Sequence, residues 1–197
     1  MSATPEGIED EKKRLRAMAR ARAAAEAPRR AAHARDMVDH LLASPLWPLD
    51  GAAPVLAYLA LEGEPSLDGL WLAPTGTTLA APRIDWEAKA MEAAALGSLE
   101  DVELTRRVRQ PPASSPTIEP GALRLVLVPG LLFDRRGGRL GRGAGFYDRY
   151  LARLGPGTVT CGVCYRSQLV DRVPTEDHDV RVGMILTEDG LRETAAG

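Results

Sequence analysis

A run of glycines and arginines in the second half of the chain carries the residue types that bind phosphate. Residues 137–145 hold five glycines, with Arg139 and Arg142 among them, and Asp148 follows shortly after. Glycines let backbone N–H groups turn toward an anion at a helix N-terminus, and arginine offers a rigid fork of donors. A carboxylate at Asp148 suits a Mg²⁺ ion that bridges phosphates. The segment predicts a phosphate loop; a tight strand-to-helix connection with solvated arginines is the alternative.

A basic stripe near the N-terminus is a second candidate. Lys12, Arg16 and Arg20 are spaced four residues apart, so in a helix they share one face. Like charges at this spacing destabilise a helix slightly, and a bound polyanion would offset that cost. The alternative is a solvated basic face.

Two acidic features complete the set of candidates. The sequence EDHD at 176–179 follows a proline and precedes the last expected strand, and it suits either a metal or phosphate-side site or a polar turn. Glu64 lies on a loop at the end of an expected strand. Its two oxygens can accept hydrogen bonds from a pair of ligand N–H groups, although by itself it is also an ordinary surface glutamate.

The elements that must position these residues alternate between strands and helices. Helices are expected at 8–27, 29–42, 67–72, 85–96 and 147–154, and strands at 54–61, 76–82, 102–108, 123–134, 158–165 and 182–190. The continuous apolar run at 123–134 is typical of a central parallel strand. We expect an α/β three-layer sandwich around a mostly parallel sheet, with the N-terminal helices packed alongside. Residues 1–7 are expected to be disordered and 8–197 to form a single domain.

Composition excludes several classes of function. A net charge of −2 gives no bulk attraction to nucleic acid or to an acidic membrane, and the chain has no apolar run long enough to span a bilayer. Cys161 and Cys164 form a lone CxxC on an expected strand, where positions three apart face opposite sides. We expect two small core residues in a reducing compartment, not a zinc site. The Arg- and Ala-rich stretch at 12–35 lacks the pattern of a cleaved signal, so we expect a cytoplasmic protein.

The glycine–arginine run is the centre of a longer resemblance. The segment VPGLLFDRRGGRLGRGAGFYDRYL closely resembles the signature of the 5-formyltetrahydrofolate cyclo-ligase family, which reads roughly VPGxxFDxxGxRxGxGGGYYDRYL. Similarities in the same order run over about residues 12–190, at Lys12–Arg16, Glu64, Ala81–Arg83, Ile118–Pro120, Gln168, Val173–Pro174 and His178–Asp179. The central block is specific, and the flanking matches gain their weight as a series.

The resemblance implies an enzyme with ATP and Mg²⁺ as cofactors and a small-molecule substrate, 5-formyltetrahydrofolate. In the family's chemistry the formyl oxygen attacks the γ-phosphate and ADP leaves. N10 then closes onto the activated carbon and phosphate leaves, which gives 5,10-methenyltetrahydrofolate. The protein must therefore position the reactants and neutralise charge. We expect a monomer that binds neither nucleic acid nor membrane.

The resemblance also implies a role for each matching position. The implied ATP-binding residues are Lys12, Lys13, Arg14, Leu15, Arg16, Arg139, Leu140, Gly141, Arg142, Gly143, Ala144, Gly145, Phe146 and Tyr147. The implied folate-binding residues are Leu59, Glu64, Arg142, Gly143, Ala144, Gly145 and Phe146, and the implied Mg²⁺ ligands are Asp148 and Asp179. Among these, Arg142 is to stabilise the transferred phosphoryl group, Arg16 to lie near the formyl group, and Tyr147 to position the reactants.

Four departures from the family pattern keep other functions open. Ala144 replaces a glycine or lysine, Phe146 replaces a tyrosine, and Gly183 stands where an aspartate is common. The Pro- and Ser-rich segment at 110–120 replaces a loop that in the family helps to enclose the pterin. One alternative is a paralogue with the same ATP loop and a different substrate. Another is a non-catalytic nucleic-acid module that uses the basic helix, which the near-neutral charge disfavours.

Overall fold

The computed structural model describes residues 5–48, 51, 53–176 and 178–195. The helices are α1 (Pro5–Ala25), α2 (Arg30–Leu42), α3 (Gly69–Leu72) and α4 (Phe146–Leu151), with short 3₁₀ helices η1 (Leu99–Asp101), η2 (Pro120–Ala122) and η3 (Arg166–Gln168). The strands are β1 (Val55–Leu56), β2 (Leu79–Asp85), β3 (Ala90–Ala95), β4 (Glu103–Thr105), β5 (Val108–Gln110), β6 (Thr117–Ile118), β7 (Leu125–Pro129), β8 (Leu132–Asp134), β9 (Arg139–Leu140), β10 (Val159–Val163), β11 (Leu169–Val170), β12 (Met184–Thr187) and β13 (Gly190–Glu193).

A large sheet forms the middle of the molecule. Its strand order is β13-β12-β10-β7-β1-β2-β3-β6. The central strands β12, β10, β7, β1 and β2 run parallel to their neighbours, whereas β13, β3 and β6 pair antiparallel at the two edges. This sheet confirms the expected α/β architecture. The expected central strand is β7, which lies between β10 and β1.

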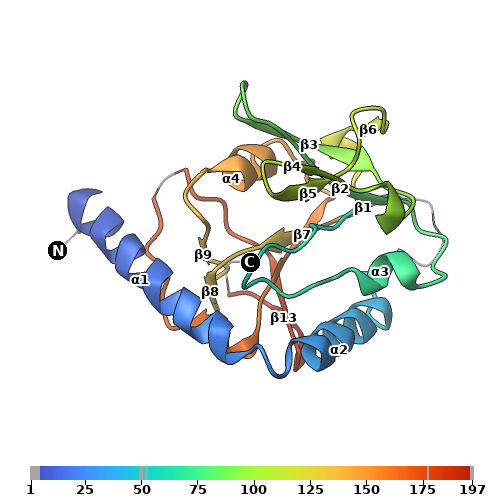
Figure 1. Cartoon of the computed structure of the whole chain (residues 1–197). Coiled ribbons are helices and arrows are strands. Elements are labelled where there is room, and N and C mark those ends of the chain that lie inside the picture. Colours follow the sequence, from blue (N-terminus) through green and yellow to red (C-terminus); the bar gives the residue numbers. More distant parts are fainter. Residues whose placement is uncertain (1–4, 49–50, 52, 177, 196–197) are drawn as a thin grey trace.

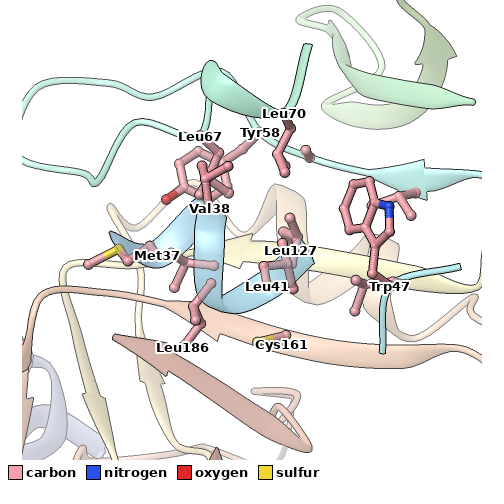
Figure 2. Close-up of a cluster of buried hydrophobic side chains, with 14 of the residues drawn as sticks. Met37, Val38, Leu41, Trp47, Tyr58, Leu67, Leu70, Leu127, Cys161 and Leu186 are labelled. Atoms are coloured by element: carbon pink, nitrogen blue, oxygen red, sulfur yellow. The ribbon is translucent and has the colours of Figure 1, made fainter. Parts of the chain in front are cut away.

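Helices cover both faces of this sheet (Figure 1). On one face, Met37, Val38 and Leu41 of α2 pack against strand residues that include Leu127 and Leu186 (Figure 2). On the other face α4 covers the alternate positions of the same strands, as in the cluster of Leu56, Ala80, Val126, Val128, Tyr150 and Leu151. Both cores are packed with buried apolar side chains, so the strands are held rigidly and their carboxyl ends are fixed in space.

Helix α1 lies alongside the sandwich, and its apolar side covers a second, three-stranded sheet of order β11-β8-β9 (Figure 1). Leu15 and Ala19 pack there against Leu131, Leu132, Leu140 and Val173. The contact places the polar side of α1 beside the glycine loop (residues 137–145), since Leu140, a core residue of this cluster, lies within that loop. No described helix is long and apolar enough to cross a membrane.

The two cysteines lie where the sequence placed them, on opposite sides of the large sheet. Cys161 belongs to the α2 side and Cys164 to the α4 side, and both are free and buried. Burial raises the pKa of Cys161 to about 12 and that of Cys164 well above its usual range. The thiolate form that redox and metal chemistry needs is therefore disfavoured at both positions.

The helix expected at 85–96 is wrong. This segment is a turn followed by strand β3, which pairs antiparallel with β2 over six positions. Alanine favours a helix locally, but here Met91 and Ala93 face the core beneath α4. Ladder hydrogen bonds and burial on one face outweigh the local preference.

Other boundaries also differ from expectation. The strand expected at 102–108 is the hairpin β4–β5, whose turn residues Arg106 and Arg107 both have positive φ, at 50° and 66°. The apolar run at 123–134 divides between β7 of the large sheet and β8 of the small one. Helix α1 already begins at Pro5, and residues 1–4 of the segment expected to be disordered lie outside the described residues.

Candidate active site

One cavity of about 340 Å³ opens at the carboxyl ends of the parallel strands. Its walls come from the loops that follow β1, β2 and β7, from the glycine loop before α4, from α1 and from the segment before β12. In open α/β sheets this edge is where ligands bind. The cavity brings together most of the positions that the sequence singled out: Lys12, Arg16, Leu59, Glu64, Arg139–Asp148 and Asp179.

The glycine loop is held in place by a buried carboxylate. Asp134, 1% exposed, accepts hydrogen bonds from the N–H groups of Arg136 and Gly138 and, through its other oxygen, from Val173 N–H at 2.7 Å. Gly137 in this turn has a φ of 78°, and a side chain there would collide with the carbonyl of Val182. The Phe133–Asp134 pair of the signature and the Val173–Pro174 pair thus form one structural unit beneath the loop.

The far end of the loop needs glycine at two positions. Gly143 and Gly145 have φ values of 101° and 65°, in the region that L side chains rarely adopt. Ala144 between them is not among the residues with positive φ, so its methyl group fits without backbone strain. The departure at 144 from the family pattern is accommodated by this conformation.

Only one side of α1 reaches the cavity. Glu9, Lys12 and Arg16 line it, while Lys13 and Arg14 are exposed elsewhere and Leu15 is buried against the small sheet. The structure therefore brings two of the five residues at 12–16 to the site. Arg20, the third member of the expected stripe, is exposed and lies outside the cavity walls.

Lys12 is 5% exposed and joins α1 to the segment before β12. Its Nζ donates to Glu176 Oε2 at 2.7 Å and to Asp179 Oδ2 at 2.8 Å. Burial by itself disfavours the charged amine, but these two hydrogen bonds outweigh it, and the pKa of Lys12 is raised. His178 lines the cavity and is largely exposed, while Asp177 lies outside the described residues.

The two carboxylates expected to hold Mg²⁺ both line the cavity. Asp148 Oδ1 accepts from Arg139 Nη2 at 2.7 Å, and its other oxygen has no hydrogen bond within the described part of the chain. No group of three or more potential metal ligands occurs among the described residues. Mg²⁺ usually keeps several waters and takes only one or two protein carboxylates beside substrate phosphates. The donor set of Asp148 and Asp179 fits such an ion.

Glu64 and Arg142 bond to each other across the cavity. Arg142 Nε donates to Glu64 Oε1 at 3.0 Å, and its Nη2 donates to the carbonyl of Glu62. The Glu64 side chain is only 4% exposed, and its other oxygen accepts Leu61 N–H at 2.9 Å. Gln168, fully buried, supports the same turn by donating to the carbonyl of Gly63. Arg142 itself remains 42% exposed, so it can leave Glu64 for a ligand.

Every lysine and arginine that lines the cavity is paired with a carboxylate. The pairs are Lys12 with Glu176 and Asp179, Arg16 with Glu9, Arg109 with Asp68, Arg139 with Asp148, and Arg142 with Glu64. An anion that binds here competes with these carboxylates for the same cations. A ligand that carries both phosphates and a divalent cation supplies partners for both members of such pairs.

Tyr147 forms part of the wall between the two ends of the cavity. Its hydroxyl is buried without a hydrogen-bond partner in the described structure, and Arg139 lies over its ring at 5.7 Å. Burial, together with the nearby charge of Glu64, raises the pKa of Tyr147 well above its usual range. The hydroxyl is therefore a neutral donor, and a bound ligand can supply its missing acceptor.

The sequence interpretation missed all but Pro82 of a further wall of the cavity. It consists of Pro82, Ile84, Trp86, Val108 and Arg109. Trp86 meets the ring of Phe146 edge-on at 5.7 Å, so Phe146 is a wall residue without needing a hydroxyl. Trp86, an aromatic residue just after the carboxyl end of β2, is the sequence signal for this wall. It was missed because a helix was expected at 85–96. Gly183 lies outside the cavity walls, and a side chain would have room there.

Comparisons with known proteins connect the sequence and the fold to one family. A profile of the 5-formyltetrahydrofolate cyclo-ligase family matches residues 8–188. A 5-formyltetrahydrofolate cyclo-ligase of Mus musculus is 32% identical over 121 residues, which cover 55% of this chain and 59% of the mouse protein. One from Mycolicibacterium smegmatis is 43% identical over 77 residues, which cover 39% and 40% of the two chains. The aligned segments thus span about half the length of these relatives.

Solved structures match over more of the chain. A 5,10-methenyltetrahydrofolate synthetase of Aquifex aeolicus superposes with a TM-score of 0.79 and 25% identity, covering 94% of each chain. A synthetase from Mycoplasma pneumoniae gives a TM-score of 0.70 at 19% identity, covering 90% of this chain and 98% of that one, which shows a common fold.

Proposed function

Because the chain belongs to the 5-formyltetrahydrofolate cyclo-ligase family, we propose that it converts 5-formyltetrahydrofolate into 5,10-methenyltetrahydrofolate with ATP and Mg²⁺. The observation that carries this proposal is the single cavity that holds both halves of the site. The part lined by Lys12, Arg16, Asp148 and Asp179, here called the phosphate end, suits MgATP, and Glu64 and Leu59 line the same cavity. The two are joined through Arg142 and Tyr147, at the place where a phosphoryl group would move.

At the phosphate end, Lys12, Arg16 and Arg142 are the cations that would take the phosphate oxygens. Asp148 and Asp179 would hold Mg²⁺, which neutralises charge on the phosphates. MgATP suits this arrangement, because a phosphate that takes Lys12 frees Asp179 to become a ligand of the metal. Arg139 is the least available of these cations, since its side chain is 5% exposed and bonded to Asp148; we assign it to positioning that carboxylate.

At the other end, the Glu64 carboxylate is fixed by Leu61 N–H and lies in an apolar wall. A pterin presents adjacent N–H donors that match a carboxylate. When a substrate takes Glu64, Arg142 loses its partner and is free to stabilise the transferred phosphoryl group. The formyl oxygen attacks the γ-phosphorus and the bond to ADP breaks. N10 then bonds to the formyl carbon and the C–O bond to phosphate breaks.

The alternative with support in the structure is a different substrate for the same nucleotide site. The observation that favours it is the wall of Ile84, Trp86 and Val108, which lies beside the Pro- and Ser-rich segment. The cations and carboxylates of the phosphate end would be unchanged in that case.

The test is the appearance of methenyltetrahydrofolate absorbance with purified protein, 5-formyltetrahydrofolate and MgATP. A rise that requires all three components supports the proposal. If there is no rise while MgATP still binds by calorimetry, the folate assignment is wrong and the nucleotide site stands. If MgATP does not bind either, both halves of the proposal fail.

A further inference from the structure

We propose that Arg83, which does not touch the cavity, is a positioning residue that sets the affinity of the site for its organic substrate. The inference rests on the proposed function and adds a residue to it. Arg83 lies in β2 between Pro82 and Ile84, two residues of the cavity wall. Neighbouring positions of a strand point to opposite faces, so the guanidinium of Arg83 lies behind the wall that its neighbours form.

The guanidinium holds the Pro- and Ser-rich segment by its main chain. Nη1 donates to the carbonyls of Pro112, Ala113 and Ser115 at 2.9, 3.2 and 2.9 Å. Nη2 donates to Thr117 Oγ1 at 3.0 Å. Three carbonyls that converge on one nitrogen define the path of this segment.

The remaining donors of Arg83 bond to β3. Nε donates to Glu92 Oε1 at 2.8 Å, and Nη2 lies 2.7 Å from the same oxygen. Glu92 Oε2 in turn accepts from Thr117 Oγ1 at 3.2 Å. All the nitrogens of the guanidinium are thus used, and the side chain is only 15% exposed. A guanidinium with five N–H donors can serve this many acceptors, whereas a lysine amine has three donors on a single atom.

Apart from Arg83, the segment is held by a turn bond from Ser115 N–H to the carbonyl of Pro112 at 3.0 Å and, at its carboxyl end, by the bond from Ala95 N–H to the carbonyl of Pro116 at 2.9 Å that leads into the β3–β6 pairing. Of residues 111–116 only Pro111 is buried, and Ala113, Ser114 and Pro116 are exposed. A surface segment without packed side chains is ordered by its backbone hydrogen bonds alone. Arg83 supplies N–H donors to carbonyls that would otherwise bond to water.

The segment matters to the cavity because it continues the hairpin β4–β5. Val108 and Arg109 of β5 line the cavity, and Gln110, which follows them, accepts Ile84 N–H through its side-chain oxygen at 3.3 Å. The hairpin also reaches Trp86, since Arg106 lies over that ring at 5.4 Å. Arg83 and Gln110 therefore hold the two strands that form the wall, β2 and β5, in place relative to each other.

This geometry predicts which kinetic parameter responds. The phosphate end is built from α1, the glycine loop and the segment before β12, none of which bonds to Arg83. Loosening the wall makes the organic substrate order it on binding, which raises KM for that substrate. The KM for ATP and the turnover at saturation remain near the wild-type values.

The experiment compares Arg83→Lys and Arg83→Met with Arg153→Met as matched control. Arg153 lines the same groove as Arg83, lies over the ring of Tyr150 at 5.8 Å, and makes no bond to the segment at 111–117 in the described structure. Steady-state kinetics with 5-formyltetrahydrofolate and ATP varied in turn are combined with calorimetric binding of the folate without ATP. Circular dichroism and thermal unfolding report the fold of each variant.

We expect Arg83→Met to raise KM and Kd for the folate about tenfold, Arg83→Lys to raise them by less, and Arg153→Met to change neither. The ratio between the KM values of the Arg83 variants for folate and for ATP is the decisive readout. A loss of turnover with unchanged KM in folded variants would assign Arg83 to stability alone and overturn the inference. If Arg83→Met does not fold, the Lys variant decides by the same criterion. If the wild-type protein forms no methenyltetrahydrofolate, the proposed function fails. The inference about Arg83 is then tested by the folate Kd alone, and an unchanged Kd in the Arg83 variants rejects it.

Discussion

Replacing Arg142 by alanine tests the centre of the proposed mechanism. In phosphoryl transfer an arginine that stabilises the transferred group contributes about 10³–10⁵ in kcat. We assign three cations to phosphate: Lys12, Arg16 and Arg142. Arg142 is the most exposed of them, and it bonds to Glu64. We therefore expect Arg142→Ala to lower kcat by about 10³ or more, with the fold intact.

The same change affects stability through Glu64. The Glu64 carboxylate is 4% exposed, and Arg142 is the cation that bonds to it. Breaking a buried ion pair by removing one partner costs about 3–5 kcal/mol. Arg142 is 42% exposed, so water partly replaces it at the pair. We expect the free energy of unfolding to fall by about 1–2 kcal/mol, which lowers Tm by about 3–6 °C for a domain of this size.

The double variant Arg142→Ala with Glu64→Gln separates the two effects. Glutamine keeps an oxygen for Leu61 N–H and removes the unpaired charge, so Tm should recover toward the wild-type value while turnover stays lost. The assay is single-turnover formation of methenyltetrahydrofolate, beside thermal unfolding of the same preparations. A kcat for Arg142→Ala within tenfold of wild type would refute the assigned role. A Tm that the second change lowers further would refute the argument about the unpaired carboxylate.

Three further predictions follow from the described contacts. Asp148→Asn should raise the Mg²⁺ concentration for half-maximal rate at least about tenfold, and an identical Mg²⁺ titration would exclude this ligand. Ala144→Gly should leave kcat within about twofold, because the alanine is not strained; a large gain in rate would show that its methyl group obstructs the site. Burial opposes ionisation of Asp179, but hydrogen bonds from Lys12 and from Glu176 N–H outweigh it and lower its pKa from the usual 3.8. The stability that this carboxylate contributes is present above pH 3.8 and is lost as the pH falls through the lowered value. Asp179→Asn should therefore unfold with a flatter dependence on pH in this range, and an unchanged acid-unfolding profile would contradict the assignment.

The parts of this protein that its sequence predicted are those governed by local chemistry. The apolar run around Leu127 identified the central strand because a strand buried on both faces needs no polar positions. The opposite placement of Cys161 and Cys164 followed from the strand period. Residues 139–148 of the glycine–arginine run line one cavity, and their role as a phosphate loop stays a prediction.

Tertiary structure decided what local preference could not. The alanines of β3 became a strand only because β2 offered a ladder and α4 covered one face. That single change places Trp86 in the cavity wall and Glu92 beside Arg83. The pairing of Arg142 with Glu64 joins residues 78 positions apart, and no periodicity in a sequence encodes such a contact. Residue types and spacing therefore indicated the family and the candidate site, whereas long-range packing decided which charges meet and which residues form the cavity wall, because those contacts depend on the positions of whole elements.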